Sequence, residues 1–389
     1  MRMWKVFVKT LREESRDLMA LSLSLLMTPV FVGLYWLYFA GGSTVYQVMV
    51  LNNDQAVVAA DGTRIAAGEE VIAALQGEAY ADGQEVLRVK VVEDREKAEA
   101  ALQNRKSQVL LIIPEEFSET VLAVKEGATP EPVEVTMVGD LTNPYYSIAA
   151  ILTFAELDTY IQYSTGEIRP FYLNEIALGG SGARTEFELY IPGLLIFAIV
   201  MMIFDSSMIV AGEAEAGTFK RLKITKLTTF ELLGGLSAAV IFMGLIGLMI
   251  TFGTAYLLGF RSYGSMWVAL FIAVVTSFSV IGAGLMVAAF SKNSNQAFVL
   301  ANFPLVLFMF FSGAIYPLPA VEMFTFGEIT INLYDILPPT HAVVAMNKVL
   351  SLGVGLGEVT YEIVALIVLS VIYFAAGVWL FNRNHMRAI

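Results

Sequence analysis

Residues 18–40 read LMALSLSLLMTPVFVGLYWLYFA, a run of 23 residues without one charged side chain. A hydrocarbon core of about 30 Å is crossed by roughly 20 apolar residues in an α-helix. This run is therefore long enough to span a bilayer. The composition of the 389-residue chain agrees, because 57% of it is hydrophobic and 15% is charged, whereas soluble globular domains are about 25% charged.

The composition also excludes several classes of function. The chain contains no cysteine, so it has no disulfide framework, no thiolate nucleophile and no cysteine-ligated metal site. Its two histidines, His341 and His385, are far apart in sequence. We therefore expect no metal site and no catalytic site. A soluble enzyme, a disulfide-rich secreted module and a basic nucleic-acid binder are all disfavoured.

Five further apolar stretches are long enough, or nearly so, to cross a bilayer. The six predicted transmembrane helices are 18–40, 189–211, 232–260, 265–290, 297–316 and 361–382. Six spans place both termini on one side of the membrane. Basic residues mark the cytoplasmic side, and they cluster in the N-terminal flank, in the loop 212–230 and in the tail 383–389. We therefore expect both termini to be cytoplasmic, in the cell membrane of a prokaryote.

The segment 41–188 differs sharply from the rest of the chain. It holds 10 Lys and Arg against 24 Asp and Glu, a net charge of −14, whereas the whole chain has −12. Such acidity favours solvation and opposes binding to anionic lipid or nucleic acid. The sequence therefore predicts a solvated extracytoplasmic domain inserted between the first two spans.

Local patterns within this segment predict a mixed α/β domain. Runs rich in Val, Ile and Leu indicate strands, and they lie at 46–51, 86–92, 108–113 and 133–138. Helices are expected at 69–76, 94–104, 114–125 and 144–163. Asn143 before Pro144 is a typical helix start, and we expect that last helix to pack on the sheet.

The N-terminal residues 1–17 have the pattern of an amphipathic helix. Apolar residues recur at helical spacing, beginning with Trp4, and a second stripe is basic. An interfacial helix that orients the first span is the plain interpretation. The run 18–40 has an alternative interpretation as a signal peptide, but it is longer than the 7 to 15 residues of a signal h-region, and acidic residues precede it.

The loop after the second span carries the most specific motif of the chain. Residues 212–223 read GEAEAGTFKRLK. Thr218 can cap a short helix in which Phe219 and Leu222 share one face. Thr228 and Glu231 then form a capping-box pattern before the next span. A short ordered helix between two spans offers a surface on which a partner can act.

This loop resembles that of the ATP-binding-cassette (ABC) export permeases of the type-2 class, which typically reads E-x-E-x-G-T-x-x-R-L. The residues that match this motif are Glu213, Glu215, Gly217, Thr218, Arg221 and Leu222. Three further stretches are similar to the family, namely FSGAIYPL at 311–318, LPPTHA at 337–342 and VLLIIPEEFS at 109–118. The resemblance covers essentially the whole chain. Two departures are Gly234-Gly235, where many members carry Gly-Lys, and Lys226, where a proline-bearing turn is common.

The resemblance implies a half-transporter that dimerises with a second permease chain, identical or related, and docks on ATPase subunits. The residues implied in contact with the motor are Glu213, Glu215, Gly217, Thr218, Phe219, Arg221 and Leu222. The chain has no G-x-x-x-x-G-K-[ST] phosphate cradle. ATP and Mg would therefore be bound by the partner ATPase, and this chain would itself be no enzyme. The family's habit implies export of hydrophobic or amphipathic molecules, such as drugs, lipids or lipid-linked compounds.

Asp205 is an acid within the second predicted span. Intramembrane acids are costly and are functional hypotheses by default. The alternative is an interfacial carboxylate paired with a basic residue of the N-terminal helix.

Large apolar side chains in the second and fifth spans could line an export path, because aromatic and Met side chains adapt to varied apolar ligands. They are Phe197, Met201, Phe204, Phe308, Phe310 and Phe311. Ordinary core packing is the more frequent use of such residues. Gly244, Gly247, Gly253, Gly282 and Gly284 indicate close helix packing.

The segment 317–360 holds four prolines and no spanning helix, and the resemblance implies short helices that re-enter the outer leaflet. His341 is either a gate or pH-sensing residue or, more commonly, a packing group. A membrane sensor or scaffold whose external domain binds a ligand or an envelope protein is the alternative to transport. A membrane enzyme comes third, because no catalytic constellation supports it.

Overall fold

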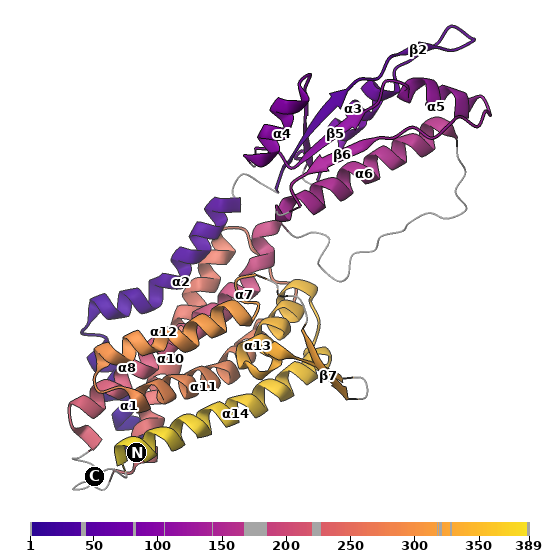
Figure 1. Ribbon diagram of the computed structural model, residues 1–389. Coiled ribbons are helices and arrows are strands. Elements are labelled where there is room, and N and C mark those ends of the chain that lie inside the picture. Colours follow the sequence, from indigo (N-terminus) through magenta and orange to yellow (C-terminus); the bar gives the residue numbers. More distant parts are fainter. Residues whose placement is uncertain are drawn as a thin grey trace. The chain divides into compact units, whose positions relative to one another are not determined.

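The computed structural model describes residues 2–39, 44–80, 83–104, 106–141, 143–166, 185–219, 227–316, 318, 321–326 and 329–386. The chain divides into two compact units, each with its own hydrophobic core. One unit is residues 1–40 with 177–389, which we call the helical unit, and the other is residues 41–176, which we call the α/β unit (Figure 1).

The helical unit consists mainly of helices, most of them long and apolar. They are α1 (Arg2–Glu14), α2 (Leu18–Phe39), α7 (Glu186–Val200), α8 (Met202–Glu215), α10 (Thr229–Leu257), α11 (Met266–Phe290), α12 (Ser294–Phe311), α13 (Pro338–Asn347) and α14 (Thr360–Phe381). Within the described ranges, five helical stretches are long and apolar enough to cross a bilayer: Glu186–Glu215, Thr229–Leu257, Met266–Phe290, Ser294–Phe311 and Leu356–His385. Residues Ser24–Phe39 of α2 form a shorter apolar helix. The predicted character of a multi-helix membrane protein is confirmed.

Capping interactions determine where several of these helices begin. Thr185 and Glu188 form a capping box at the start of α7, which begins three residues before the predicted span at 189. Thr228 and Glu231 form the capping box that the sequence predicts for α10. The Asn293 side chain accepts the backbone N–H of Gln296 at 2.8 Å, so α12 begins before residue 297. Helix α12 ends at Phe311 rather than at residue 316.

Helix α11 packs closely against α14 and α8, and glycine makes both contacts possible (Figure 1). A Cβ added at Gly282 would collide with the backbone of α14 at Tyr373, and one added at Gly377 would collide with the Gly282 carbonyl. A Cβ at Gly284 would collide with the Ser206 side chain of α8. The predicted close packing at Gly282 and Gly284 is therefore confirmed. It is wrong for Gly253, where a Cβ would meet no atom within 4 Å.

The segment between α12 and α14 contains a hairpin that the sequence did not predict. It pairs β7 (Glu322–Phe326) with β8 (Ile329–Asn332) in antiparallel register. Short helical turns follow around α13, at Leu333–Ile336, Lys348–Leu352 and Leu356–Val359. The Tyr263 N–H donates to the Leu350 carbonyl at 3.0 Å, which fixes this segment against the loop between α10 and α11.

The α/β unit is built on a four-stranded sheet in the order β4-β1-β5-β6. Its strands are β1 (Tyr46–Asn52), β4 (Leu87–Val91), β5 (Val109–Ile113) and β6 (Thr136–Gly139). Strands β4, β1 and β5 are parallel, and β6 is antiparallel to β5. All four expected strands are present. A short antiparallel pair, β2 (Val57–Val58) with β3 (Arg64–Ile65), was not expected.

Helices cover both faces of this sheet, as buried strands on both faces require. The helices are α3 (Ala67–Gly77), α4 (Arg95–Gln103), α5 (Phe117–Lys125) and α6 (Pro144–Thr165). Val48 and Val50 of β1 share a core with α3, α5 and α6, whereas Met49 shares one with α4. This alternation follows the two-residue period of a strand. Asn143 caps α6 as expected, and the expected packing of that helix on the sheet is confirmed.

Helix α1 lies against α10 at the Gly234-Gly235 pair. A Cβ added at Gly235 would lie 2.6 Å from the Val6 Cβ and 2.8 Å from the Met3 carbonyl oxygen. Val6 and Thr10 are buried, whereas Trp4 on the other face is exposed. The Gly234-Gly235 pair, where the sequence departs from Gly-Lys, thus lies where α1 packs closely on α10.

We predict that Gly235→Leu displaces α1 from α10, because overpacking of a close contact costs about 1–3 kcal/mol. Hydrogen exchange of the α1 amides should become at least several-fold faster. Gly253→Leu is the matched control on the same helix, because its side chain would enter open space. Equal exchange rates of α1 in the two variants would show that Gly235 does not seat α1.

Candidate functional site

The residues of the predicted motor contact lie at the end of α8. Glu213 and Glu215 belong to its last turn, and Gly217 has a φ of +69°, which ends the helix. Thr218 and Phe219 begin a new helical turn. Arg221 and Leu222, and the predicted departure at Lys226, lie outside the described residues. The described part of the site is therefore segment 212–219.

Glu213 connects this segment to α1 by an ion pair. The Lys9 ammonium lies 2.5 Å from Glu213 Oε1 and 3.3 Å from Glu13 Oε2, one turn further along α1. The Glu213 side chain is only 11% exposed, which strengthens the attraction relative to a fully solvated pair. The N-terminal helix and the end of α8 are thus linked by charge.

Glu215 connects the same segment to the start of α12. Its carboxylate accepts the backbone N–H of Ser294 at 3.3 Å. The Ser294 hydroxyl donates in turn to the Met208 carbonyl of α8 at 3.1 Å. A carboxylate is stabilised at a helix N-terminus by the unpaired N–H groups and the helix dipole.

Phe219 connects the segment to the end of α14. Its side chain is 3% exposed, and its ring lies 4.9 Å from the ring of Phe381. Phe381 stacks in turn on His385 at 4.7 Å. Segment 212–219 therefore contacts three helices, α1, α12 and α14, and a displacement of this segment has a physical route to each of them.

The sequence identified the residues within segment 212–219 but not these partners. Lys9, Ser294 and Phe381 carry no local signal that assigns them to this segment. Lys9 and Glu213, for example, are 204 residues apart.

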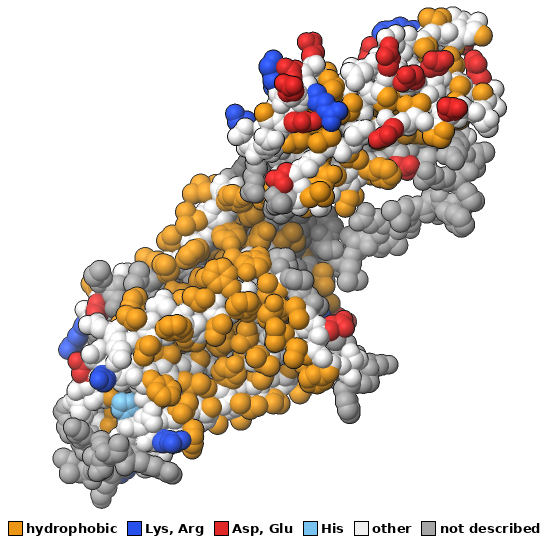
Figure 2. All heavy atoms as spheres, viewed as in Figure 1, with side chains coloured by type: hydrophobic (Ala, Val, Ile, Leu, Met, Phe, Trp, Pro, Cys, Tyr) orange, Lys and Arg blue, Asp and Glu red, His pale blue; other side chains and the backbone are white. Residues whose placement is uncertain are grey.

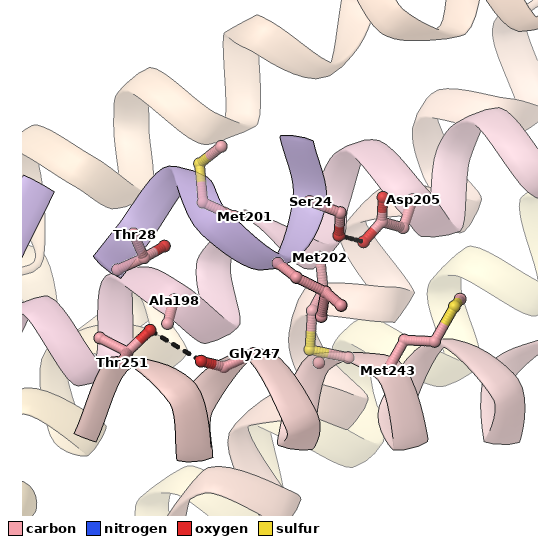
Figure 3. Close-up of a pocket in the computed structure, with 11 residues that line it drawn as sticks. Ser24, Thr28, Ala198, Met201, Met202, Asp205, Met243, Gly247 and Thr251 are labelled. Atoms are coloured by element: carbon pink, nitrogen blue, oxygen red, sulfur yellow. Dashed lines mark hydrogen bonds between the residues drawn. The ribbon is translucent and has the colours of Figure 1, made fainter. Parts of the chain in front are cut away.

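Asp205 lies in α8, beside a small polar cavity between α2, α7, α8 and α10 (Figure 3). The Ser24 hydroxyl donates to the Asp205 carboxylate at 2.7 Å. Thr28 and Thr251 add two more hydroxyls to the lining. Among the described residues Asp205 has no ion pair. The structure therefore does not show the alternative interpretation, in which Asp205 pairs with a basic residue of α1.

The charge of Asp205 acts on Glu14, at the end of α1. Burial, followed by the negative charges of Asp205, Asp17 and Glu13, raises the pKa of Glu14 from 4.5 to about 7.

In the described part of the chain, the candidate path residues lie in different surroundings. Phe197 is buried against Phe31 of α2, with ring centres 5.6 Å apart. Phe308 is buried and its ring lies 6.1 Å from that of Tyr373 in α14. These two side chains serve core packing, the more frequent use that the sequence left open.

The other candidates are less buried. Met201 lines the Asp205 cavity, and the ring of Phe204 lies 5.0 Å from that of Phe298 in α12. Phe310 and Phe311 are exposed, and Phe311 stacks on Tyr334 at 5.7 Å.

His341 is buried, with its Nε2 2.9 Å from the Asp335 carbonyl oxygen. This environment is that of a packing group. Nearby, Lys348 and Glu362 form an ion pair at 2.6 Å that sequence analysis did not identify.

Comparison with known proteins identifies the family of the chain. The family model described as "ABC-2 family transporter protein" matches residues 20–379, and the chain belongs to this family. The chain is 22% identical to proteins named "Probable multidrug ABC transporter permease YbhS" from Escherichia coli strain K12 and from Escherichia coli O157:H7. Each alignment spans 304 residues, which is 76% of this chain and 78% of the relative. The chain is thus an ABC transporter permease, a class of membrane subunit that is not itself the ATPase.

We predict that Glu14 makes the stability of the helical unit depend on pH. Its raised pKa means that the folded state binds the proton more tightly than the unfolded state. Its contribution is therefore most favourable below pH 4.5 and is lost as the pH rises to about 7. Thermal unfolding of the purified chain between pH 5 and pH 8 measures this slope.

Glu14→Gln should flatten the pH dependence in this range. Glu13→Gln, which changes an exposed neighbour, should retain most of it. An unchanged slope in Glu14→Gln would show that this carboxyl does not titrate near neutral pH.

Proposed function

We propose that this chain is the permease subunit of an ABC exporter for hydrophobic or amphipathic molecules, such as drugs, lipids or lipid-linked compounds. It would act with a second permease chain, identical or related, and with ATPase subunits that bind ATP and Mg. The name of the YbhS relatives, which includes multidrug transport, supports the substrate class. The protein would lie in the cell membrane of a prokaryote.

The proposed topology has six spans, with α2 as the first and both termini cytoplasmic. The 22 residues of α2 suffice to cross the hydrocarbon core. Contacts of segment 212–219 with α1 and with the end of α14 support a common side for the two termini. In this topology the α/β unit is the extracytoplasmic domain.

The observation that carries the proposal is the set of contacts made by segment 212–219. A motor that moves this segment acts at once on α1 through Glu213, on α12 through Glu215 and on α14 through Phe219. Helices α8, α11 and α14 are in close contact at glycines, so they resist independent motion. The movement would therefore reach the membrane interior as a displacement of whole helices.

The exposed surface of the helical unit could form one wall of an export path, with lipid or a second chain as the other wall. The visible face is almost continuously hydrophobic (Figure 2). Helix α12 exposes large side chains along its length, namely Phe298, Val299, Phe303, Val306, Leu307, Phe310 and Phe311. An apolar path between two permeases would suit apolar cargo.

We predict that Glu213→Gln and Arg221→Gln uncouple ATP hydrolysis from transport in the complex with the ATPase. Both variants should fold and should co-purify with the ATPase. Substrate-stimulated ATPase activity and efflux of a lipophilic fluorescent dye should fall several-fold. Glu13→Gln is the control, because Glu13 shares Lys9 with Glu213 but lies within α1 itself.

If substrate still stimulates the ATPase fully in both Glu213→Gln and Arg221→Gln, segment 212–219 does not couple ATP hydrolysis to transport. Absence of any co-purifying ATPase would instead favour the membrane sensor or scaffold.

A further inference from the structure

Helix α6 of the α/β unit presents an apolar face to solvent. Its opposite face, with Ala149, Leu157 and Tyr160, is buried in the core of the unit. We call the exposed side chains of α6, together with Leu141 just before the helix, the α6 patch; they are Leu141, Tyr145, Ile148, Ile151 and Phe154, and they are between 42% and 86% exposed. A contiguous apolar surface on a solvated domain marks an interaction site.

The α6 patch is also free of charge. Residues 141–155 include no charged side chain, although segment 41–188 has a net charge of −14. Acidic side chains are spread over the visible face of the unit, and hydrophobic side chains lie over α6 (Figure 2). The flanking charges are Asp140, directly before Leu141, and Glu156 and Asp158 on α6; the helix contains no Lys or Arg.

These features disfavour two kinds of occupant. Helices that bind a membrane surface carry Lys and Arg on their polar face, and α6 has neither. Small apolar ligands occupy concave sites, whereas the outer side of a single helix is convex. The remaining partner is another protein surface.

We propose that the α6 patch binds the α6 patch of a second copy of this chain, with the two helices antiparallel about a twofold axis near Ile148 and Ile151. A twofold interface brings the same surface of both copies together, so it requires a self-complementary patch. An uncharged apolar stripe meets that requirement. This inference rests on the proposed pairing of permease chains and specifies the surface at which their external domains meet.

The exposed apolar area supplies more than half of such a contact. A large aromatic side chain has a surface of about 150–250 Å². With the exposed fractions of its five side chains, the α6 patch has an exposed apolar area on the order of 500 Å² per copy. A standard interface buries about 800 Å² per partner. Polar residues that flank the patch, such as Ser147 and Thr159, would supply the remainder.

The antiparallel arrangement also keeps the two Glu156 side chains apart. With a rise of about 1.5 Å per residue, Glu156 lies roughly 10 Å along the helix from the axis. The two Glu156 side chains would be roughly 20 Å apart, well beyond the screening length of about 8 Å.

The absence of cysteine from the chain allows a direct test with single cysteines in the full-length protein in its membrane. A short bis-maleimide would be used that matches the separation of packed helices, about 8–10 Å. Ile151→Cys should give an adduct of twice the 42.5 kDa chain mass. Tyr163→Cys, at a residue that is 90% exposed, should give none, because antiparallel copies place these positions roughly 40 Å apart.

Two further variants complete the test. Ala100→Cys, at an exposed position on α4 across the sheet, controls for random collision. Adding Phe154→Asp to Ile151→Cys should reduce the adduct at least several-fold, because it places a charge within the patch.

Equal adducts from Ile151→Cys, Tyr163→Cys and Ala100→Cys would overturn the inference. It would also be overturned if Ile151→Cys gave no adduct although a monofunctional maleimide labels that cysteine. An Ile151→Cys adduct of any other mass would assign the patch to a different partner. Co-purification of the ATPase from the same membranes distinguishes a failure of the α6 pairing from a failure of the proposed function. If the ATPase is present and the adduct is absent, the α6 pairing is wrong and the proposed function stands.

Discussion

The close contact of α8 with α11 is the constraint on which the rest of the helical unit depends. Ser206 of α8 lies where a side chain at Gly284 would have to be, so the two helices approach without an intervening side chain. Gly282 and Gly377 extend the same close packing to α14. Packed interfaces of this kind move between discrete arrangements rather than deforming continuously. A displacement of the end of α8 is therefore transmitted to α11 and α14.

The three contacts of segment 212–219 differ in strength and so in role. An ion pair near the surface, such as Lys9 with Glu213, contributes about 0–1 kcal/mol. The aromatic pair of Phe219 with Phe381 adds about 0.5–1.5 kcal/mol beyond the burial of the rings. Phe219 thus anchors the segment, whereas Glu213 and Glu215 determine its orientation. Contacts this weak can be exchanged during a transport cycle.

The sequence predicted those parts of the structure that depend on local pattern. Apolar runs indicated the helices, Val-rich runs indicated the four strands, and the Thr228–Glu231 spacing indicated a capping box. Contacts between distant segments were not predictable, because nothing near Lys9 or Phe381 refers to the segment after α8. The β7–β8 hairpin was missed because the region 317–360 was interpreted from its prolines and from the family resemblance. The buried positions of Phe197 and Phe308 likewise follow from helix rotation, which one sequence does not determine.

The central claim is that segment 212–219 faces the cytoplasm, where the motor binds ATP. Thr218→Cys tests it directly, because the natural chain contains no cysteine that would react. A membrane-impermeant maleimide should leave this variant unlabelled in intact cells and should label it after the membrane is permeabilised. Labelling in intact cells would place the segment on the opposite side of the bilayer from the ATPase and would contradict the account.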